Sequence, residues 1–132
     1  MKFHHYGLLV SDIDTSIDRF KSFNYEMVIK DKDELQQAEL SILENKHSRI
    51  ELVCPFADNE SLNKLLRNKS DNGYHLCFEV QDIDLTCKEL QKNKIVLYEF
   101  SKPKPAKIFQ QRRVAFYYIN GMGLIEFLES GI

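Results

Sequence analysis

The stretch "FHHYGLLVSDID", residues 3–14, decides the fold, because a related stretch, "GYHLCFEVQDID", returns at residues 73–84. Each contains a histidine, four mostly apolar residues, a valine and, after one polar residue, Asp-Ile-Asp. His75 follows His5 by 70 positions, and Val80 follows Val10 by the same interval. A repeat at one interval indicates that the chain consists of two copies of one supersecondary unit.

The first copy is predicted to contain one helix between its first and second strands. The expected elements are a strand at 3–10, a helix at 12–23, and strands at 24–30, 37–44 and 49–55. The helix carries Ile13, Ile17 and Phe20 at helical spacing, and either Asp12 or Asp14 is expected to be its N-cap. The polar stretch "ENKHS" between the last two strands predicts a hairpin turn, with His47 exposed to solvent.

The second copy repeats this order after a polar connection at 56–72, in which one short helix is expected around 60–67. The expected elements are a strand at 74–80, a helix at 82–92, a strand at 95–100, a loop at 101–112, and strands at 113–119 and 123–129. Phe116, Tyr117 and Tyr118, in the strand at 113–119, are expected to fill the core. The sequence therefore predicts an α+β fold of two βαβββ modules, 1–55 and 73–132, in a single domain, 1–132. Since one module cannot bury a sheet face alone, the two are expected to form a curved mixed β-sheet that encloses a cleft.

Four polar residues occupy corresponding positions in the two modules. His5 and His75 open the first strands, and Glu51 and Glu126 lie within the last strands, in "RIELV" and "LIEFL". Because strand neighbours point to opposite faces, the apolar residues beside each glutamate are expected to pack on the helices, and the glutamates to face the other side. The repeat selects His5 rather than His4, since His5 and His75 each stand five positions before a valine.

A divalent metal site would account for all four residues. Two carboxylates that converge inside a protein repel each other, and a buried carboxylate needs a partner. A divalent cation meets both needs, and two neutral imidazoles complete a mixed site that suits Zn, Ni, Co, Mn or Fe. Taken singly, each histidine is more often a core or surface residue, and each glutamate more often faces water. Their register with the repeat favours the metal site.

Composition and charge exclude some classes of binding partner. A net charge of −2 and a pI of about 6.1 argue against nucleic acid, and apolar runs such as "VAFYYI" are too short to span a bilayer. The N-terminal residues show no signal-peptide pattern, so a cytoplasmic location is expected. The three cysteines lack metal-finger spacing and are expected to be buried free thiols: Cys54, Cys77 and Cys87.

The sequence resembles the vicinal oxygen chelate superfamily, the group of glyoxalase I, methylmalonyl-CoA epimerase and extradiol dioxygenase. The resemblance covers residues 3–129 and rests on "HHYGLLVSDID", "RIELV", "YHLCFEVQDID" and "GLIEFLE". It implies a glyoxalase-like fold, often a homodimer, and one divalent metal ion. The implied ligands are His5, Glu51, His75 and Glu126, with Glu51 and Glu126 also as the catalytic acid and base.

Within that group the connection "ELVCPFADNESLNKLL" and the hairpin "RRVAFYYINGMGLIEFLE" are most similar to the epimerases. This resemblance implies an epimerase or isomerase that removes a proton next to a thioester carbonyl, through an enediolate stabilised by the metal. Two departures are visible. Gln36 stands where epimerases have an acid, and Leu9 stands where glyoxalases have an arginine that helps to hold glutathione.

Three alternatives stay open. A glyoxalase I-like lactoylglutathione lyase would use the same ligands. An extradiol dioxygenase needs two histidines and one carboxylate on Fe(II), so Glu51 would be superfluous. A non-catalytic small-molecule binding or resistance protein would need no metal. The basic segment at 101–113 is either a phosphate-binding element for a coenzyme A or carrier-protein thioester or a solvated loop.

Overall fold

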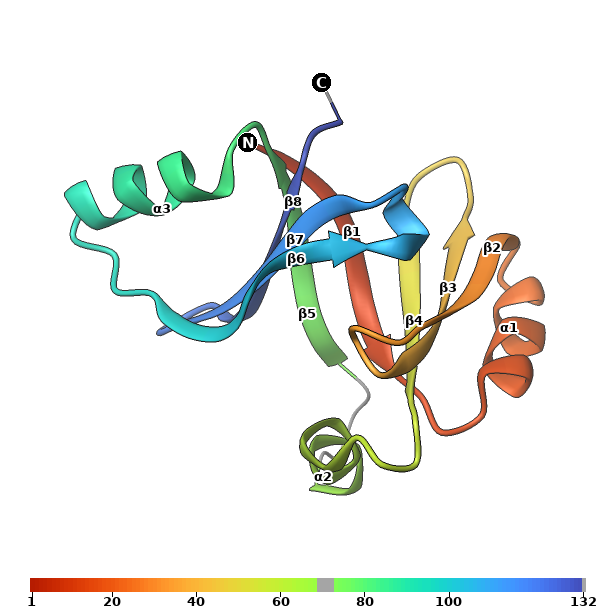
Figure 1. Ribbon diagram of the computed structural model, residues 1–132. Coiled ribbons are helices and arrows are strands. Elements are labelled where there is room, and N and C mark those ends of the chain that lie inside the picture. The colour runs from red at the N-terminus through yellow and green to blue at the C-terminus, as the bar shows by residue number, and fades with distance from the viewer. Residues whose placement is uncertain (69–72, 132) are drawn as a thin grey trace. The chain divides into compact units, whose positions relative to one another are not determined.

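The computed structural model describes residues 1–68 and 73–131 of the chain (Figure 1). Its contacts group the residues into two compact units. The N-terminal unit is His5–Tyr74, and the C-terminal unit is His75–Ile132 together with Met1–His4. Within the described residues, no helix combines the length and apolar character that a bilayer crossing requires.

The N-terminal unit is a four-stranded mixed sheet with one helix packed on it. Its elements are β1 (Lys2–Leu9, of which the unit holds His5 onward), α1 (Ile13–Lys21), β2 (Glu26–Asp33), β3 (Ala38–Glu44), β4 (Arg49–Pro55) and α2 (Glu60–Asn68). The strand order is β2-β3-β4-β1, antiparallel except for the parallel pair β1 and β4. The module predicted for residues 1–55 has this order of elements.

The start of helix α1 is determined by its N-cap, Asp12, and by the spacing of its apolar residues. The Asp12 side chain accepts a hydrogen bond of 3.1 Å from the backbone N–H of Thr15, so Asp12 rather than Asp14 is the N-cap. Ile13 and Ile17 are buried against Leu43 and Leu52 of the sheet. The helix is thereby held on the sheet face to which Leu43 and Leu52 point.

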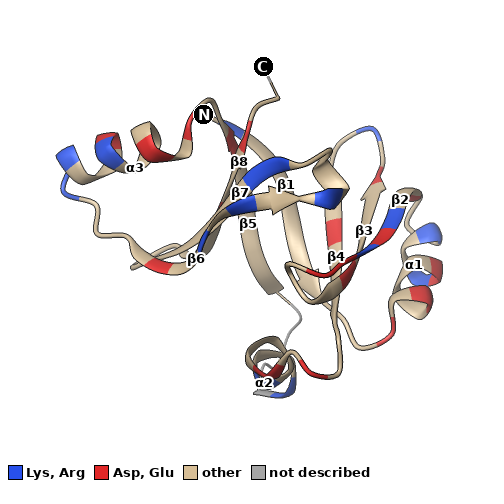
Figure 2. Cartoon of the chain, in the orientation of Figure 1, with Lys and Arg blue, Asp and Glu red and all other residues tan. Residues whose placement is uncertain are grey.

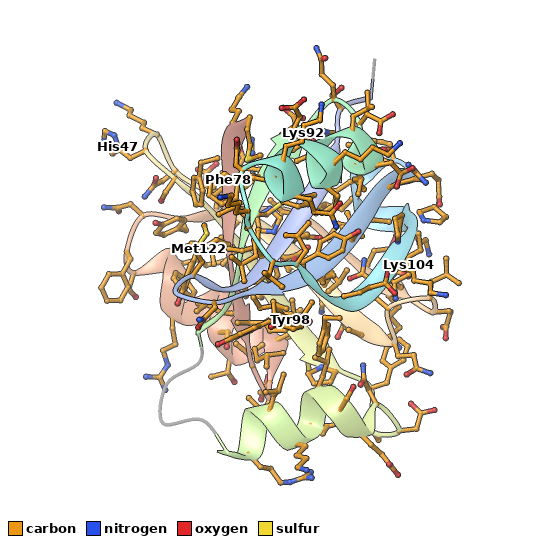
Figure 3. All side chains as sticks on the ribbon, turned by 90° about the vertical axis from the view of Figure 1, so that its left-hand side faces the viewer. His47, Phe78, Lys92, Tyr98, Lys104 and Met122 are labelled. Carbon is orange, nitrogen blue, oxygen red and sulfur yellow. The ribbon has the colours of Figure 1, made fainter. Side chains whose placement is uncertain are left out.

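The C-terminal unit repeats this architecture. Its elements are β5 (Gly73–Val80, of which the unit holds His75 onward), α3 (Ile83–Lys92), β6 (Tyr98–Ala106), the short 3₁₀-helix η1 (Lys107–Phe109), β7 (Arg112–Ile119) and β8 (Gly123–Glu129). The strand order is β5-β8-β7-β6, and the parallel pair is β5 and β8. Phe3 at the start of β1 packs edge-on against Phe78, with ring centroids 5.7 Å apart; Phe78 is labelled in Figure 3. The predicted α+β class and the twofold βαβββ order are confirmed.

The prediction of a loop at 101–112 is wrong for the first half of this range, because strand β6 runs from Tyr98 to Ala106. Proline cannot donate to a ladder, and it is tolerated where a strand is an edge or carries a bulge. Strand β6 meets both conditions: it ends the strand order of its unit, and its pairing with β7 shifts register on either side of Ser101. Pro103 and Pro105 therefore lie within a strand.

Strand β2 also lies later than the predicted range of 24–30. The C-terminal turn of α1 uses the residues before it, because Asn24 has a positive φ of 67° and the Tyr25 N–H donates to the carbonyl of Phe20. The strand then continues to Asp33, whose carboxylate accepts hydrogen bonds from the backbone N–H groups of Leu35 and Gln36. That Asx-type turn, not the hydrophobic pattern, ends the strand.

Candidate metal site

The first histidine–glutamate pair is built by the parallel pairing of β1 with β4. In this register Gly7 lies opposite Glu51, and His5 lies two residues before Gly7 on the same face of β1. The His5 Nε2 atom is 3.5 Å from the Glu51 Oε1 atom. Both side chains are almost fully buried, at 0% and 2% exposed.

The second pair has the same construction in the other unit. Cys77 of β5 lies opposite Glu126 of β8, and His75 lies two residues before Cys77. The His75 Nε2 atom is 3.0 Å from the Glu126 Oε1 atom, and these side chains are equally buried. Each unit therefore brings together its predicted histidine and its predicted glutamate, on the two strands of its parallel pair.

Strand parity behaves as the sequence predicts in both units. Ile50 and Leu52, on either side of Glu51, pack in the core that contains Ile13 and Ile17 of α1. The corresponding residues beside Glu126 do the same with the other helix: Ile125 and Phe127 pack in the core with Ile83. The glutamates consequently point away from the helices, into the opposite sheet face.

The donor atoms in each pair suit a divalent metal ion. Imidazole nitrogen and carboxylate oxygen are common zinc ligands, and two atoms bound at about 2.1 Å lie about 3.0 Å apart at a right angle and about 3.4 Å apart at a tetrahedral angle. The observed separations of 3.0 and 3.5 Å match this range. The residues therefore fit the ion that the sequence implies.

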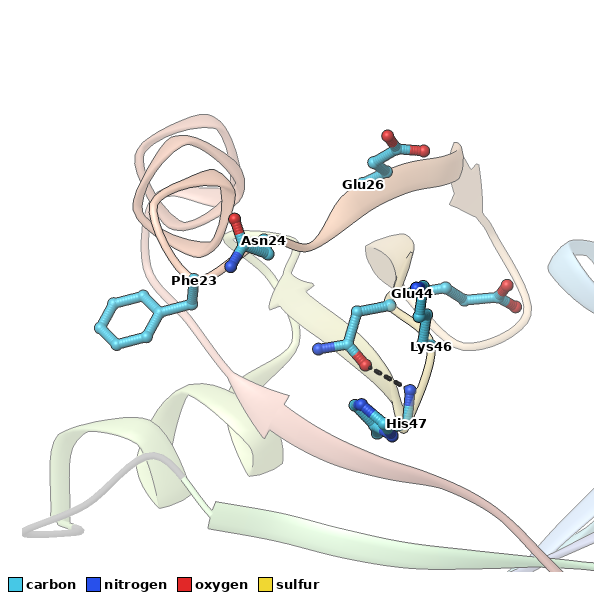
Figure 4. A pocket seen from close by; sticks show the side chains of 7 residues that line it. Phe23, Asn24, Glu26, Glu44, Lys46 and His47 are labelled. Carbon is cyan, nitrogen blue, oxygen red and sulfur yellow. Dashed lines mark hydrogen bonds between the residues drawn. The ribbon is translucent and has the colours of Figure 1, made fainter.

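Two other histidines take no part in these pairs. His4 packs edge-on against Phe109, with ring centroids 5.4 Å apart. His47 is exposed in the turn between β3 and β4, as predicted, and its backbone N–H donates to the Asn45 side chain (Figure 4). A hollow of about 670 Å³ lies beside this turn. Figure 4 draws the residues that line it: Phe23, Asn24, Glu26, Glu44, Asn45, Lys46 and His47. The hollow contains none of the four predicted ligands.

Phe116 has a role at the site that sequence reasoning missed. It was expected only to fill the core, together with its neighbours in β7, but its ring packs edge-on on His75, with centroids 5.1 Å apart. The register places Phe116 directly opposite Glu126, so it contacts the pair from the next strand. The sequence offers one signal for this position: Phe116 is two residues after the core residue Val114, so the two side chains point to the same face of the strand. Tyr118, also expected in the core, is 49% exposed.

The basic residues of the segment lie on β6, η1 and the start of β7, where Figure 2 colours Lys and Arg blue. Arg112 is held by Glu79 and by the carbonyl of Glu129, and Arg113 forms two hydrogen bonds of 2.7 and 2.8 Å with the Glu129 carboxylate. This pairing raises the pKa of Arg113 and lowers that of Glu129. The lysines of the segment lie on β6 and η1: Lys102, Lys104 and Lys107.

Gln36, which the sequence resemblance sets against an acid of the epimerases, is part of the turn between β2 and β3. Its side-chain amide donates a 3.1 Å hydrogen bond to the Asp33 carboxylate. The backbone there is held by Asn59, whose amide donates to the carbonyls of Gln36 and Gln37. Gln37 has a positive φ of 54°, so this contact fixes an unusual backbone conformation.

The cysteines are free thiols, as predicted, although only Cys77 is fully buried. Burial raises the pKa of the Cys54 and Cys87 thiols. Because the thiolate is the reactive form, a raised pKa makes both cysteines poor nucleophiles.

Comparison with known proteins supports this description. Residues 4–116 match the family model of the Glyoxalase/Bleomycin resistance protein/Dioxygenase superfamily. No curated protein sequence matches the chain significantly. Among solved structures, a hypothetical protein from Bacillus halodurans is similar with a TM-score of 0.84 and 21% identity, over 99% of this chain and 95% of that one.

Methylmalonyl-CoA epimerases are also similar in structure. The enzyme from Mycobacterium tuberculosis has a TM-score of 0.81 and 21% identity, over 99% of this chain and 89% of that one. A Streptomyces coelicolor variant in complex with 2-nitronate-propionyl-CoA has a TM-score of 0.79 and 17% identity, over 100% and 99% of the two chains. These similarities show the glyoxalase-like fold. The chain belongs to the Glyoxalase/Bleomycin resistance protein/Dioxygenase superfamily, the vicinal oxygen chelate group.

Proposed function

We propose that this protein is a divalent-metal-dependent epimerase or isomerase that moves a proton next to the carbonyl of an acyl thioester. The observation that carries the proposal is the equivalent burial of one histidine–glutamate pair in each unit. We propose that His5, Glu51, His75 and Glu126 are ligands of one ion, as the internal repeat predicts. Its identity among Zn, Ni, Co, Mn and Fe follows from metal availability as much as from the ligands.

The chemistry divides between the ion and the side chains. When bound, a divalent cation stabilises the negative charge that develops on substrate oxygens. The two histidines hold their neutral imidazole nitrogens toward the site, and the two carboxylates balance the charge of the cation. A glutamate oxygen takes the proton from the carbon next to the carbonyl, and a glutamate returns one, which is general acid–base catalysis.

The substrate class rests on two observations. Solved epimerases with this fold bind an acyl-CoA analogue or methylmalonyl-CoA. Strand β6 and η1 carry three lysines, Lys102, Lys104 and Lys107. Lysine ammonium groups are suited to the phosphates of such a thioester. A lactoylglutathione lyase is the second candidate, and Leu9, fully buried on β1, offers no cation to a glutathione carboxylate.

The experiment is deuterium exchange with methylmalonyl-CoA in D₂O. Metal-loaded protein is expected to introduce deuterium at carbon 2, whereas protein stripped by chelation is not. The variant His75→Ala, which removes one proposed ligand, is expected to lose this exchange. His47→Ala is its matched control, because His47 is exposed and lies outside both pairs. Turnover of a glutathione hemithioacetal, without exchange on the thioester, would move the assignment to the lyase. Lack of any metal affinity would contradict both enzymatic functions and favour a binding protein.

The homodimer and the cytoplasmic location inferred from the sequence are part of this proposal. Light scattering of the purified protein tests the first, and localisation of a tagged chain in cells tests the second.

A further inference from the structure

A row of aromatic side chains extends from the second histidine–glutamate pair across the sheet of the C-terminal unit. In β7, Phe116 lies opposite Glu126, and Tyr118 follows Phe116 by two residues. Tyr98, on the edge strand β6, lies directly opposite Tyr118. Side chains two residues apart in a strand share a face, and so do those directly opposite each other on paired strands. Phe116, Tyr118 and Tyr98 therefore form a continuous row on the face that carries Glu126.

The alternate residues of β7 confirm which face this is. Tyr117 and Ile119 are buried in the core that contains Ile83 of helix α3. Tyr118 lies between them in the strand, so its side chain points away from the helix. The row is thus on the opposite face of the sheet from α3, together with the proposed metal ligands of this unit.

The row is buried at the metal ligands and exposed at the sheet edge. Phe116 is buried against His75, whereas Tyr118 is 49% and Tyr98 is 58% exposed. In the other direction along β7 the same face is closed, because Val114 is fully buried. Neighbouring exposed aromatic side chains are typical of binding surfaces. The accessible aromatic surface of this face therefore begins next to the proposed ligands and runs outward through Tyr118 to Tyr98.

The position of Tyr118 suits a large substituent on the reacting carbon. Two residues of a strand span about 7 Å, so Tyr118 stands about that far along β7 from the position opposite Glu126. In the proposed reaction the carbon next to the carbonyl exchanges its proton with a glutamate, so every group on that carbon lies close to the ligands. A methyl group does not reach as far as Tyr118, whereas a phenyl ring on one further carbon does. Aromatic rings attract each other in offset or edge-to-face contact.

We infer that Tyr98 and Tyr118 are specificity-determining residues, which select acyl thioesters with a large apolar group, such as an aromatic ring, on the carbon that exchanges its proton. The inference rests on the proposed function and narrows its substrate class. Tyr118 provides the inner contact, next to Phe116, and Tyr98 extends the surface to the edge of the sheet. Both act through their rings.

The test compares deuterium exchange into two thioesters that differ only in this substituent, methylmalonyl-CoA and 2-benzylmalonyl-CoA. For metal-loaded wild-type protein, kcat/KM for the benzyl compound is expected to exceed that for the methyl compound about tenfold. In Tyr118→Ala this advantage should fall to about twofold or less, because the ring contact is lost. Tyr118→Phe should retain the advantage, since it keeps the ring and removes only the hydroxyl group.

The matched control is Tyr6→Ala, which removes a tyrosine that is 37% exposed in the N-terminal unit. This variant should show the wild-type preference between the two thioesters. The double variant Tyr98→Ala, Tyr118→Ala should show none. Because both of these tyrosines are exposed, their replacement should change stability little, and urea unfolding checks this.

Two results would overturn the inference and leave the proposed function intact: equal kcat/KM for the two thioesters in the wild type, or a preference that survives in the double variant. If the double variant kept the preference but changed a dimer into a monomer in light scattering, the tyrosines would contact a second copy of the chain instead. Wild-type protein that binds Co²⁺ but exchanges a proton of neither thioester would contradict the proposed function itself, so the two failures are distinguishable.

Discussion

The Nε2 atom of His75 lies 3.0 Å from Oε1 of Glu126, although the two residues open and close one module of the chain. The parallel pairing of β5 with β8 produces this contact, and the pairing of β1 with β4 produces its counterpart. In both units a histidine two residues before the paired position meets the glutamate of the neighbouring strand. The same local geometry, formed once in each unit, brings together the proposed metal ligands.

Removing one proposed ligand, His75, should weaken metal binding strongly. We expect His75→Ala to lower Co²⁺ affinity by at least about 100-fold, because loss of even an outer partner of a metal ligand costs about 10–100-fold. Calorimetric titration measures the affinity, and His47→Ala should bind as the wild type does. Saturating Co²⁺ at 100 times its Kd should add about 2.7 kcal/mol to the free energy of unfolding of the wild type. An unchanged melting temperature on metal addition would contradict this.

Helix α3 is anchored by its first residue. Ile83 is fully buried in the core of the C-terminal unit, while Leu85 on the same helix is 60% exposed. Ile83→Ala should destabilise the protein by about 2–5 kcal/mol through lost burial and the cavity it leaves. Leu85→Ala should change stability by less than about 0.5 kcal/mol. Urea unfolding measures both, and equal effects would show that α3 does not depend on this contact.

Acid should loosen the start of the same helix through Glu129. Its carboxylate accepts from Arg113 and from the backbone N–H of Ile83, and the hydrogen bonds from Arg113 lower its pKa below 4.5. A lowered pKa in the folded state gives stability that is present above the unfolded-state pKa and is lost as pH falls through the folded-state value. Since Arg113 is 42% exposed, about 1 kcal/mol or less is expected.

The measurement for Glu129 is the free energy of unfolding as a function of pH. The wild type should lose stability below pH 4.5 more steeply than Glu129→Gln, whose side chain does not titrate. Parallel curves for the two proteins would show that this carboxylate is not coupled to folding.

Asn59 joins helix α2 to the turn between β2 and β3 by two separable kinds of hydrogen bond. Its side-chain oxygen accepts from the Leu62 N–H, and its amide donates to the carbonyls of Gln36 and Gln37. Asn59→Ala should lose both and cost about 1–3 kcal/mol. Asn59→Asp keeps the cap and loses the donor, so it should recover only part of the loss. Recovery to wild-type stability would mean that the bonds to the turn contribute nothing.

The lysines of β6 and η1 should affect affinity for a phosphate-bearing substrate. Lys102 and Lys104 lie on β6, the strand that begins at Tyr98, and Figure 3 labels Tyr98 and Lys104. The side chains of Lys102 and Lys107 are exposed. We expect the double variant Lys102→Gln, Lys107→Gln to raise KM for methylmalonyl-CoA about three- to tenfold with little change in kcat, the effect of losing about 1 kcal/mol of exposed charge attraction. KM for a pantetheine thioester should be unchanged.

Lys46→Gln, in the turn between β3 and β4, is the control for that double variant, because it removes one exposed positive charge elsewhere on the chain. If the double variant raised KM similarly for methylmalonyl-CoA and for the pantetheine thioester, these lysines would not bind the phosphates.

Much of the fold followed from periodicity, and the exceptions have local causes. Glu51 and Glu126 were assigned to the face opposite the helices because alternation along a strand is a property of neighbouring residues. A strand was predicted at 95–100, but the second half of β6 was assigned to a loop, because its prolines resemble a loop until the edge position and the register shifts are known. Tyr118 was assigned to the core because its apolar strand does not reveal how far a face is covered.

The amino-acid sequence by itself determined the order of the elements, the twofold repeat, and which histidine and glutamate each module offers. These depend on spacing along the chain. Only the tertiary structure decided that β1 pairs in parallel with β4 and β5 with β8, and hence that Gly7 stands beside Glu51 while Cys77 and Phe116 stand beside Glu126. Strand pairing joins residues far apart in sequence through backbone hydrogen bonds. It therefore sets the neighbours of each carboxylate, which no local pattern contains.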